Sequence, residues 1–237
     1  MSCCSTFCTT TQRQFSPRLA ARQLARYRRK GPDPTTRLLR DLLIALNPTN
    51  RTLLDIGAGI GVLTCELLHA GFEHATAVDA SSAYVEAGRK EAARRRLAAS
   101  VDWVEGDFVD LAPRLPRADV VTLDRVVCCY PAYEPLLTAA LDHASHVVGL
   151  SYPRDRWYVR AVMAFDNGVR RLRGGAFRTF VHAPTGMSAL LLAGGFHLVG
   201  RRTTLTWSVD VYTRMNAAAH THEGHGNVLA VSSRVIT

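Results

Sequence analysis

The chain has 237 residues, of which 47% are hydrophobic and 21% charged, and its formal net charge is +9. This length and apolar content can bury the core of an enzyme-sized domain, which excludes a disordered or low-complexity chain. No apolar run reaches the roughly 20 residues of a membrane-spanning helix, so no transmembrane segment is expected. The six cysteines include no C-x-x-C pair, which favours a reducing, cytoplasmic compartment.

The basic charge is concentrated at the N-terminus, where the first 30 residues contain seven basic side chains and no acid. We expect residues 1–32 to form a basic helical arm ahead of the main domain. Three roles are open for this arm. It could be an organelle transit peptide, it could contact nucleic acid or a membrane surface, or it could be a solvated helix that folds over the site of the following domain.

An apolar strand over 53–56 leads into a glycine-rich loop, in the run Leu53-Leu-Asp-Ile-Gly-Ala-Gly-Ile-Gly-Val62. Glycines at this spacing let the backbone turn sharply and approach a ligand closely, and the next helix would point its N-terminus at that ligand. The spacing differs from the dinucleotide fingerprint G-x-G-x-x-G, and an acid two residues before the first glycine suits an ammonium group better than a pyrophosphate. We therefore expect a cationic nucleoside ligand rather than the NAD of an oxidoreductase, bound by Asp55, Gly57, Ala58, Gly59 and Gly61.

Two further strands end in acids. The strand over 75–79 ends in Asp79, which precedes Ala80, and the strand over 101–105 is followed by Asp107 and Phe108. An ionised Asp79 can accept hydrogen bonds from both hydroxyls of a ribose. Asp107 could accept from an adenine amine while Phe108 covers the ring. Because ligands bind at the carboxyl ends of strands in open α/β sheets, we expect these residues to surround one site.

Seven strands alternate with helices along the chain. The segments 119–123 and 145–150 complete a parallel core of five strands, and 196–202 and 204–212 follow each other almost directly, as in an antiparallel hairpin. The fold class is therefore α/β, with a seven-stranded, doubly wound, mostly parallel sheet and a C-terminal antiparallel hairpin.

The order of these acids and glycines resembles the class I S-adenosylmethionine-dependent methyltransferases. The resemblance extends from about Pro34 to Arg214 and implies a Rossmann-like methyltransferase domain over 33–214. It also implies S-adenosyl-L-methionine as cofactor and S-adenosyl-L-homocysteine as product, with Ala80 and Asp124 near the cofactor. No catalytic metal is expected, because Arg125 follows Asp124 and Ser151-Tyr-Pro replaces the acids that metal-dependent relatives carry after the fifth strand.

The segment after the fourth strand is similar to that of magnesium-protoporphyrin O-methyltransferases, in which an apolar run precedes a His-Tyr-Pro triplet. Here the triplet is Cys129-Tyr130-Pro131, so Cys129 replaces a histidine proposed as a base. A thiol is a poorer base unless it is deprotonated, but a carboxylate acceptor is already ionised at pH 7 and needs little base. Tyr130 is expected to align the acceptor near the methyl group. Tyr27 is a third catalytic candidate, because the N-terminal helix often closes this kind of site.

The segment 151–183 mixes aromatic residues with arginines and is expected to form a lid over the acceptor. Arg154 or Arg156 could bind a carboxylate in a fork, Trp157 could contact a flat apolar ligand, and Arg125 could orient an anionic acceptor beside the methyl group. The alternative is an amphipathic lid packed on the sheet with its arginines in water.

The sequence thus predicts methyl transfer to a small molecule, at a carboxylate or hydroxyl oxygen of an aromatic or tetrapyrrole-like compound. One alternative is an RNA methyltransferase that uses the basic arm, and another is a non-catalytic cofactor-binding subunit that activates a partner. Residues 215–237 contain three histidines without a clear period, and we expect a flexible tail there. The sequence gives no indication of the oligomeric state.

Overall fold

The computed structural model describes residues 6–47 and 51–215. Apart from Met215, the tail expected over 215–237 lies outside the described residues. Among the helices of these two ranges, none is both long and apolar enough to cross a membrane.

Seven strands form one sheet in the order β3-β2-β1-β4-β5-β7-β6. Strands β1 to β5 pair in parallel, and β7 pairs antiparallel with both β5 and β6, which confirms the predicted fold class. The order reverses between β1 and β4, and ligands of open α/β sheets bind at such a switch point. The strands are β1 (Thr52–Ile56), β2 (His74–Asp79), β3 (Val101–Glu105), β4 (Ala118–Asp124), β5 (Ala144–Pro153), β6 (Phe196–Thr203) and β7 (Trp207–Arg214).

The last strand begins three residues later than the sequence predicts. Residues 204–206 form a turn, in which the Thr204 N–H donates to the Trp207 carbonyl oxygen at 2.8 Å and the Trp207 N–H donates to Thr204 Oγ1 at 3.0 Å. These bonds close the hairpin before the ladder with β5 and β6 can begin.

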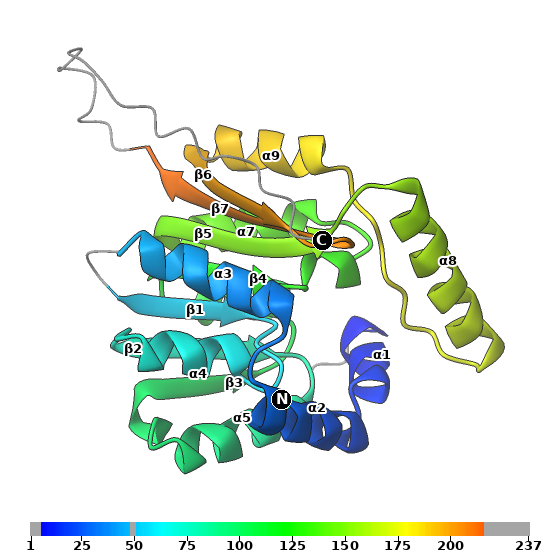
Figure 1. The fold of residues 1–237 in the computed structure, drawn as a ribbon, viewed down its shortest axis with the longest axis horizontal. Helices are drawn as coiled ribbons and strands as arrows, with labels where there is room; N and C mark the ends of the chain where they lie inside the picture. Colours follow the sequence, from blue (N-terminus) through cyan, green and yellow to red (C-terminus); the bar gives the residue numbers. More distant parts are fainter. Residues whose placement is uncertain (1–5, 48–50, 216–237) are drawn as a thin grey trace.

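Helices cover both faces of the sheet (Figure 1). They are α1 (Thr6–Gln14), α2 (Pro17–Lys30), α3 (Pro34–Ala45), α4 (Val62–His69), α5 (Ser82–Arg94), α6 (Phe108–Leu111), α7 (Glu134–His143), α8 (Trp157–Leu172) and α9 (Pro184–Ala193). The short 3-10 turns are η1 (Ala98–Ser100), η2 (Ala112–Arg114) and η3 (Val127–Cys129).

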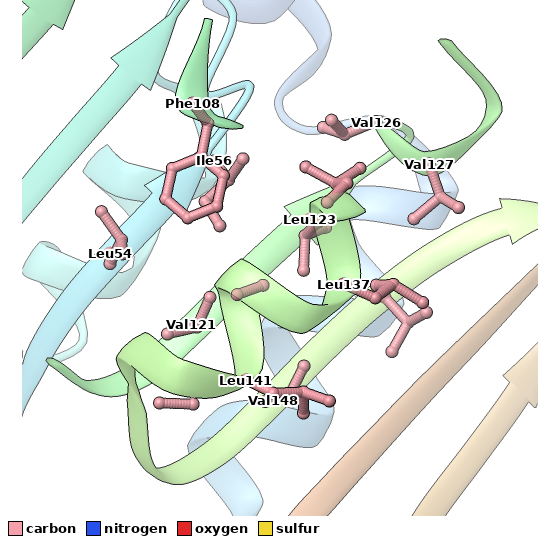
Figure 2. Packing of buried hydrophobic residues seen from close by; sticks show 14 of the residues in the cluster. Leu54, Ile56, Phe108, Val121, Leu123, Val126, Val127, Leu137, Leu141 and Val148 are labelled. Carbon is pink, nitrogen blue, oxygen red and sulfur yellow. The ribbon is translucent and has the colours of Figure 1, made fainter. Parts of the chain in front are cut away.

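Alternate residues of the central strands enter different cores, as the period of two in a strand requires. Leu54 and Ile56 of β1 pack with Leu137 and Leu141 of α7 on one face, as Figure 2 shows. Leu53 points to the other face and joins the core beneath α3 and α4. With both faces covered, the polar carboxyl ends of the strands are the part of the sheet left for a ligand.

Helix α2 packs on the domain through buried charges. The Glu91 side chain of α5 is fully buried and pairs with Arg28 of α2 at 2.8 Å. The Tyr27 hydroxyl donates to Glu66 Oε1 of α4 at 2.7 Å, and Arg40 Nη1 of α3 donates to Glu66 Oε2 at 2.6 Å. These contacts fix the basic helix beside the carboxyl ends of the strands.

Candidate functional site

A cavity of about 320 Å³ lies at the carboxyl ends of β1, β2 and β4. One part of its wall is the glycine loop after β1, together with Asp79 and Ala80 after β2. The opposite part comes from α1, from the loop after β4 and from the segment between Arg170 and Thr179. The cavity therefore combines residues that the sequence assigned to a cofactor with residues from distant parts of the chain.

The three loop glycines all have a positive φ, at +65° for Gly57, +60° for Gly59 and +74° for Gly61. A Cβ on Gly57 would lie 2.4 Å from Val126 Cγ2, and one on Gly61 would lie 2.5 Å from Trp103 Cη2. A Cβ on Gly59 would meet nothing closer than the Tyr84 ring at 3.7 Å. Neighbouring side chains thus require glycine at the first and third positions, and the middle glycine is the one with free space beside it.

Asp79 connects the ends of β1 and β2. Its Oδ2 accepts from the Gly59 N–H and its Oδ1 from the Ser81 N–H, both at 2.8 Å. Each carboxylate oxygen keeps a further lone pair for the hydroxyls of a ribose. Burial raises the pKa of Asp79 to about 6, although both N–H groups lower it.

Asp55 lies beneath the glycine loop and is almost completely buried. The Thr64 hydroxyl donates to its Oδ2 at 2.6 Å and the Thr122 hydroxyl to its Oδ1 at 2.7 Å. Burial raises the pKa of Asp55 to about 6 despite these two bonds. A cation bound in the cavity would therefore stabilise this carboxylate, in agreement with the predicted ammonium site.

These two pKa values predict that cofactor binding depends on pH. Protonation of Asp79 or Asp55 below about pH 6 removes the charge that binds a ribose or an ammonium, so affinity should fall with pH. Between about pH 7 and about pH 5, the loss is about tenfold for each carboxylate that must be ionised. Calorimetric titration with S-adenosylhomocysteine measures this effect, and an affinity that stays constant over the same range would contradict it.

The same two groups have the opposite effect on the unliganded protein. Their folded-state pKa lies above the unfolded value of 3.8, so between about pH 6 and about pH 4 the folded state binds more protons than the unfolded state. Their contribution to stability therefore increases as the pH falls through this window. Measuring the free energy of unfolding against pH for wild type and for Asp79→Asn separates the contribution of Asp79 from those of the other carboxylates.

Asp107 and Tyr130 are in direct contact. The Tyr130 hydroxyl donates to Asp107 Oδ1 at 2.6 Å, and the Val109 N–H donates to the same oxygen at 3.1 Å. Burial raises the pKa of Asp107, while these bonds lower it. Phe108 and Tyr130 both line the cavity. The residue expected near an adenine is thus bonded to the residue expected near the methyl group.

Asp124 and Arg125 end β4 in a closely bonded turn. Asp124 accepts from the Thr36 and Ser151 hydroxyls, each at 2.5 Å. Arg125 has a φ of +61°, which is costly for a residue with a side chain, and its guanidinium pairs with Asp33 at 2.7 Å. Both residues line the cavity, but this guanidinium already has an acid partner.

Cys129 lines the cavity as a neutral thiol. The hydrogen bond with Cys128 and burial raise its pKa well above the usual value. A thiol that remains protonated at neutral pH cannot accept a proton from an acceptor. The interpretation of Cys129 as a general base is therefore not supported by its surroundings.

Six of the predicted site residues do not line the cavity: Gly61 and Asp107, which lie next to lining residues, and four that lie farther along other elements. Tyr27 is buried against Glu66 and α5, and Arg154 donates to the Thr204 carbonyl oxygen at 3.0 Å. Arg156 is exposed at the start of α8, and 80% of Trp157 is exposed. The structure does not bring these four residues to the cavity, because Tyr27 faces α4 and α5 from α2, and the start of the lid segment leaves the site along β5 and the β6–β7 turn.

Several cavity residues were not identified from the sequence. Arg170 Nη1 is held by Asn167 Oδ1 at 3.1 Å and by Thr179 Oγ1 at 3.3 Å, and its guanidinium lies 5.8 Å from the centre of the Phe177 ring. Phe15 lies 5.3 Å from Phe177, measured between ring centres. The sequence did offer one signal for Arg170. The helical spacing of α8 places Asn167 and Arg170 on the same face as Val159, which is buried. Phe15 and Phe177 carried no local signal.

The donor set fits S-adenosylmethionine. Two buried carboxylates face the cavity, the backbone at Gly59 has free space, and the Thr11 hydroxyl is buried in the wall without a hydrogen-bond partner among the described residues. A ligand with an ammonium group, ribose hydroxyls and ring nitrogens complements these groups.

Comparison with known proteins gives the same result. Residues 53–149 match a methyltransferase domain. Ubiquinone/menaquinone biosynthesis C-methyltransferases (UbiE) of a Ruegeria species and of Roseobacter denitrificans are 36% identical over 81 residues and 40% identical over 68 residues. These matches cover 34% and 28% of this chain but only 32% and 26% of the relatives, so the chain matches about a third of their length or less.

Solved structures extend the likeness to most of the chain. An O-methyltransferase family protein from Burkholderia thailandensis has a TM-score of 0.69 and 15% identity, over 86% of this chain and 62% of that one. Magnesium protoporphyrin IX methyltransferase (ChlM) from Synechocystis, with bound S-adenosylhomocysteine, has a TM-score of 0.63 and 20% identity, over 88% of this chain and 100% of that one. The chain therefore contains a segment, residues 53–149, that matches a methyltransferase domain, and its fold over most of its length is that of these methyltransferases.

Proposed function

We propose that the protein transfers a methyl group from S-adenosylmethionine to an oxygen of a flat small molecule that carries a carboxylate. The observation that supports this most strongly is one cavity with cofactor acids on one side and Arg170, Phe177 and Tyr130 on the other. Its volume of about 320 Å³ lies within the usual range of small-molecule sites, about 300–1,000 Å³.

The polar groups around the acceptor side position a substrate and do not deprotonate it. When bound, the cofactor supplies an electrophilic methyl group. Cys129 remains protonated, and the Tyr130 hydroxyl is engaged as the donor of a hydrogen bond to Asp107. A carboxylate oxygen is already ionised at neutral pH, so alignment alone can suffice for its methylation.

Arg170 is the proposed carboxylate ligand. The atoms that hold its Nη1, Asn167 Oδ1 and Thr179 Oγ1, are neutral, and its guanidinium forms no salt bridge with any acid among the described residues. Arg125, by contrast, is paired with Asp33. The Phe177 ring beside Arg170 would contact the flat part of the acceptor.

Arg170→Gln is expected to raise KM for an aromatic acid by about 10- to 100-fold, which corresponds to one lost charge-assisted hydrogen bond. S-adenosylhomocysteine affinity should not change. Arg171→Gln is the matched control, because Arg171 is the next residue of α8 and is exposed outside the cavity. Equal KM values for the two variants would remove Arg170 from the acceptor site.

The test of the function begins with thermal-shift titrations of S-adenosylhomocysteine and, in parallel, NADH. A panel of planar aromatic acids is then incubated with methyl-labelled S-adenosylmethionine, next to the corresponding amides. A base-labile labelled product identifies a methyl ester, and a base-stable product indicates an ether or a C–C bond, as the C-methyltransferase name of the relatives would suggest. No transfer to any acid would contradict the proposed acceptor class.

The second candidate is methyl transfer to RNA. It is supported by the exposed arginines of α2, namely Arg18, Arg22, Arg26 and Arg29. Phosphate contacts weaken steeply with added salt, whereas a small-molecule pocket responds little. Transfer to RNA that falls sharply as salt is added, with no transfer to aromatic acids, would favour this candidate.

A further inference from the structure

Helix α8 has two faces of different character. Its inner face carries Val159, Asn167 and Arg170, of which the last lines the cavity. Val159 is the one residue of this 16-residue helix that is buried. Figure 1 shows α8 at the right, beyond the carboxyl ends of the strands and at the same end of the sheet as α1.

The outer face is apolar and exposed. Trp157 is 80% exposed, Phe165 71% and Leu172 90%, and these residues are separated by eight and seven positions, which places them along one side of a helix. Leu205 of the β6–β7 turn is 75% exposed and lies beside the start of α8, since the Tyr158 hydroxyl donates to its carbonyl oxygen at 2.8 Å. An amphipathic helix normally buries its apolar side against the core, whereas α8 exposes its apolar side to solvent.

Arginines flank this face at both ends. Arg156 and Arg160 lie at its start and Arg171 and Arg173 at its end, all of them exposed. Nearby acids are Asp155, which pairs with Arg160 at 2.5 Å, and Asp166. The flanking charge is therefore mainly positive, as is the +9 of the whole chain.

We propose that the outer face of α8, with Leu205, docks on the surface of an anionic lipid bilayer. Tryptophan, phenylalanine and leucine on one side of a helix, with arginines beside them, are the pattern of a helix that lies in the membrane interface. Arginines at both ends of the face contact anionic headgroups while the apolar side chains enter the acyl boundary.

The same arginines make it unfavourable for a second copy of the chain to cover the outer face of α8. A twofold contact brings each face against itself, with the two helices either parallel or antiparallel. Because both ends of α8 carry arginines, either orientation places arginines opposite arginines, and such like-charge contacts are costly. An anionic surface has the complementary charge for both ends.

The experiment is vesicle flotation of the full chain with phosphatidylcholine vesicles, with and without phosphatidylglycerol. Binding is expected only with phosphatidylglycerol. The variant Trp157→Ser, Phe165→Ser, Leu172→Ser should lose at least about tenfold in partitioning, because three large side chains no longer enter the lipid. The matched control is Leu192→Ser, Leu198→Ser, Val199→Ser, which removes three exposed apolar side chains of α9 and β6 and should bind like wild type.

Two further measurements test whether a second copy of the chain or the C-terminal tail covers this face instead. Light scattering that shows a wild-type dimer and a monomeric α8 variant would assign the face to a second copy and overturn the proposal. A red shift of tryptophan fluorescence on removal of residues 216–237, present in the wild type and absent from Trp157→Ser, would assign the face to the tail and overturn the proposal. Equal flotation of wild type and the α8 variant would also overturn it.

The outcome is independent of methyl transfer. Trp157, Phe165 and Leu172 lie outside the cavity, so S-adenosylhomocysteine should still raise the melting temperature of the α8 variant. If the wild type binds vesicles but not S-adenosylhomocysteine, the proposed function fails while the lipid surface stands.

Discussion

Asp79→Asn should weaken S-adenosylhomocysteine binding by about a hundredfold while the protein remains folded. The carboxylate accepts from two backbone N–H groups, and an amide presents N–H hydrogens of its own to one of these donors. The substitution also removes a charged acceptor for the ribose, and charge-assisted hydrogen bonds contribute about 1.5–3 kcal/mol each. Isothermal calorimetry measures the loss, and circular dichroism verifies the fold.

Asp102→Asn is the control for this substitution. Asp102 lies on β3, next to β2, but its side chain is exposed and pairs with His74 at 2.9 Å. Its replacement should change cofactor affinity by less than twofold, because a surface pair of this kind contributes about 1 kcal/mol at most and lies outside the cavity. If both variants bound S-adenosylhomocysteine like wild type, Asp79 would have no part in the cofactor site.

Gly61→Ala should destabilise the protein by about 3 kcal/mol. A Cβ at a φ of +74° costs about 1–2 kcal/mol in backbone strain, and here it would also lie 2.5 Å from Trp103 Cη2. The indole cannot simply move away, because it also packs tightly against Gly88 of α5, where an added Cβ would lie 2.1 Å from the same atom. For a chain of this size, the expected fall in melting temperature is about 6–12 °C.

Two further variants separate strain from packing. Gly174 has a φ of +73° and nothing within 4 Å of an added Cβ, so Gly174→Ala should cost about 1 kcal/mol. Adding Trp103→Phe to Gly61→Ala should recover part of the loss, which a double-mutant cycle would report as a coupling energy. Equal destabilisation by Gly61→Ala and Gly174→Ala would show that packing against Trp103 adds nothing to the cost of the Gly61 substitution.

The sheet and the cofactor side of the site could be predicted because their signals are local. A strand, its terminal acid and the following glycines lie within ten residues at Leu53–Val62, and β2 ends in Asp79 within the same short range. The carboxyl ends of parallel strands must meet at one edge, so these segments converge whatever the loops do. The position of each expected strand is accordingly confirmed, with small shifts at the ends.

The acceptor side could not be predicted in the same way. Phe15 and Phe177 are 162 positions apart in the sequence and touch only because α1 and the segment after α8 both reach the carboxyl end of the sheet. Arg156 and Arg170 carry the same chemical signal, and only the path of α8 decides which of them lines the cavity. The proton affinity of Cys129 depends partly on the fold as well, since Cys128 is its neighbour in sequence but its burial is set by tertiary packing.

The cavity draws its two halves from different parts of the chain. The glycine loop, Asp79 and the loop after β4 all fall within the matched segment 53–149, whereas Thr11, Phe15, Arg170 and Phe177 lie before or after it. The loop after β4, with Tyr130, reaches across from the matched segment to these flanking residues. Substitutions in α1 and α8 can therefore change the shape and charge of one wall of the cavity while leaving the glycine loop and Asp79 untouched, and a match over residues 53–149 describes only part of the lining.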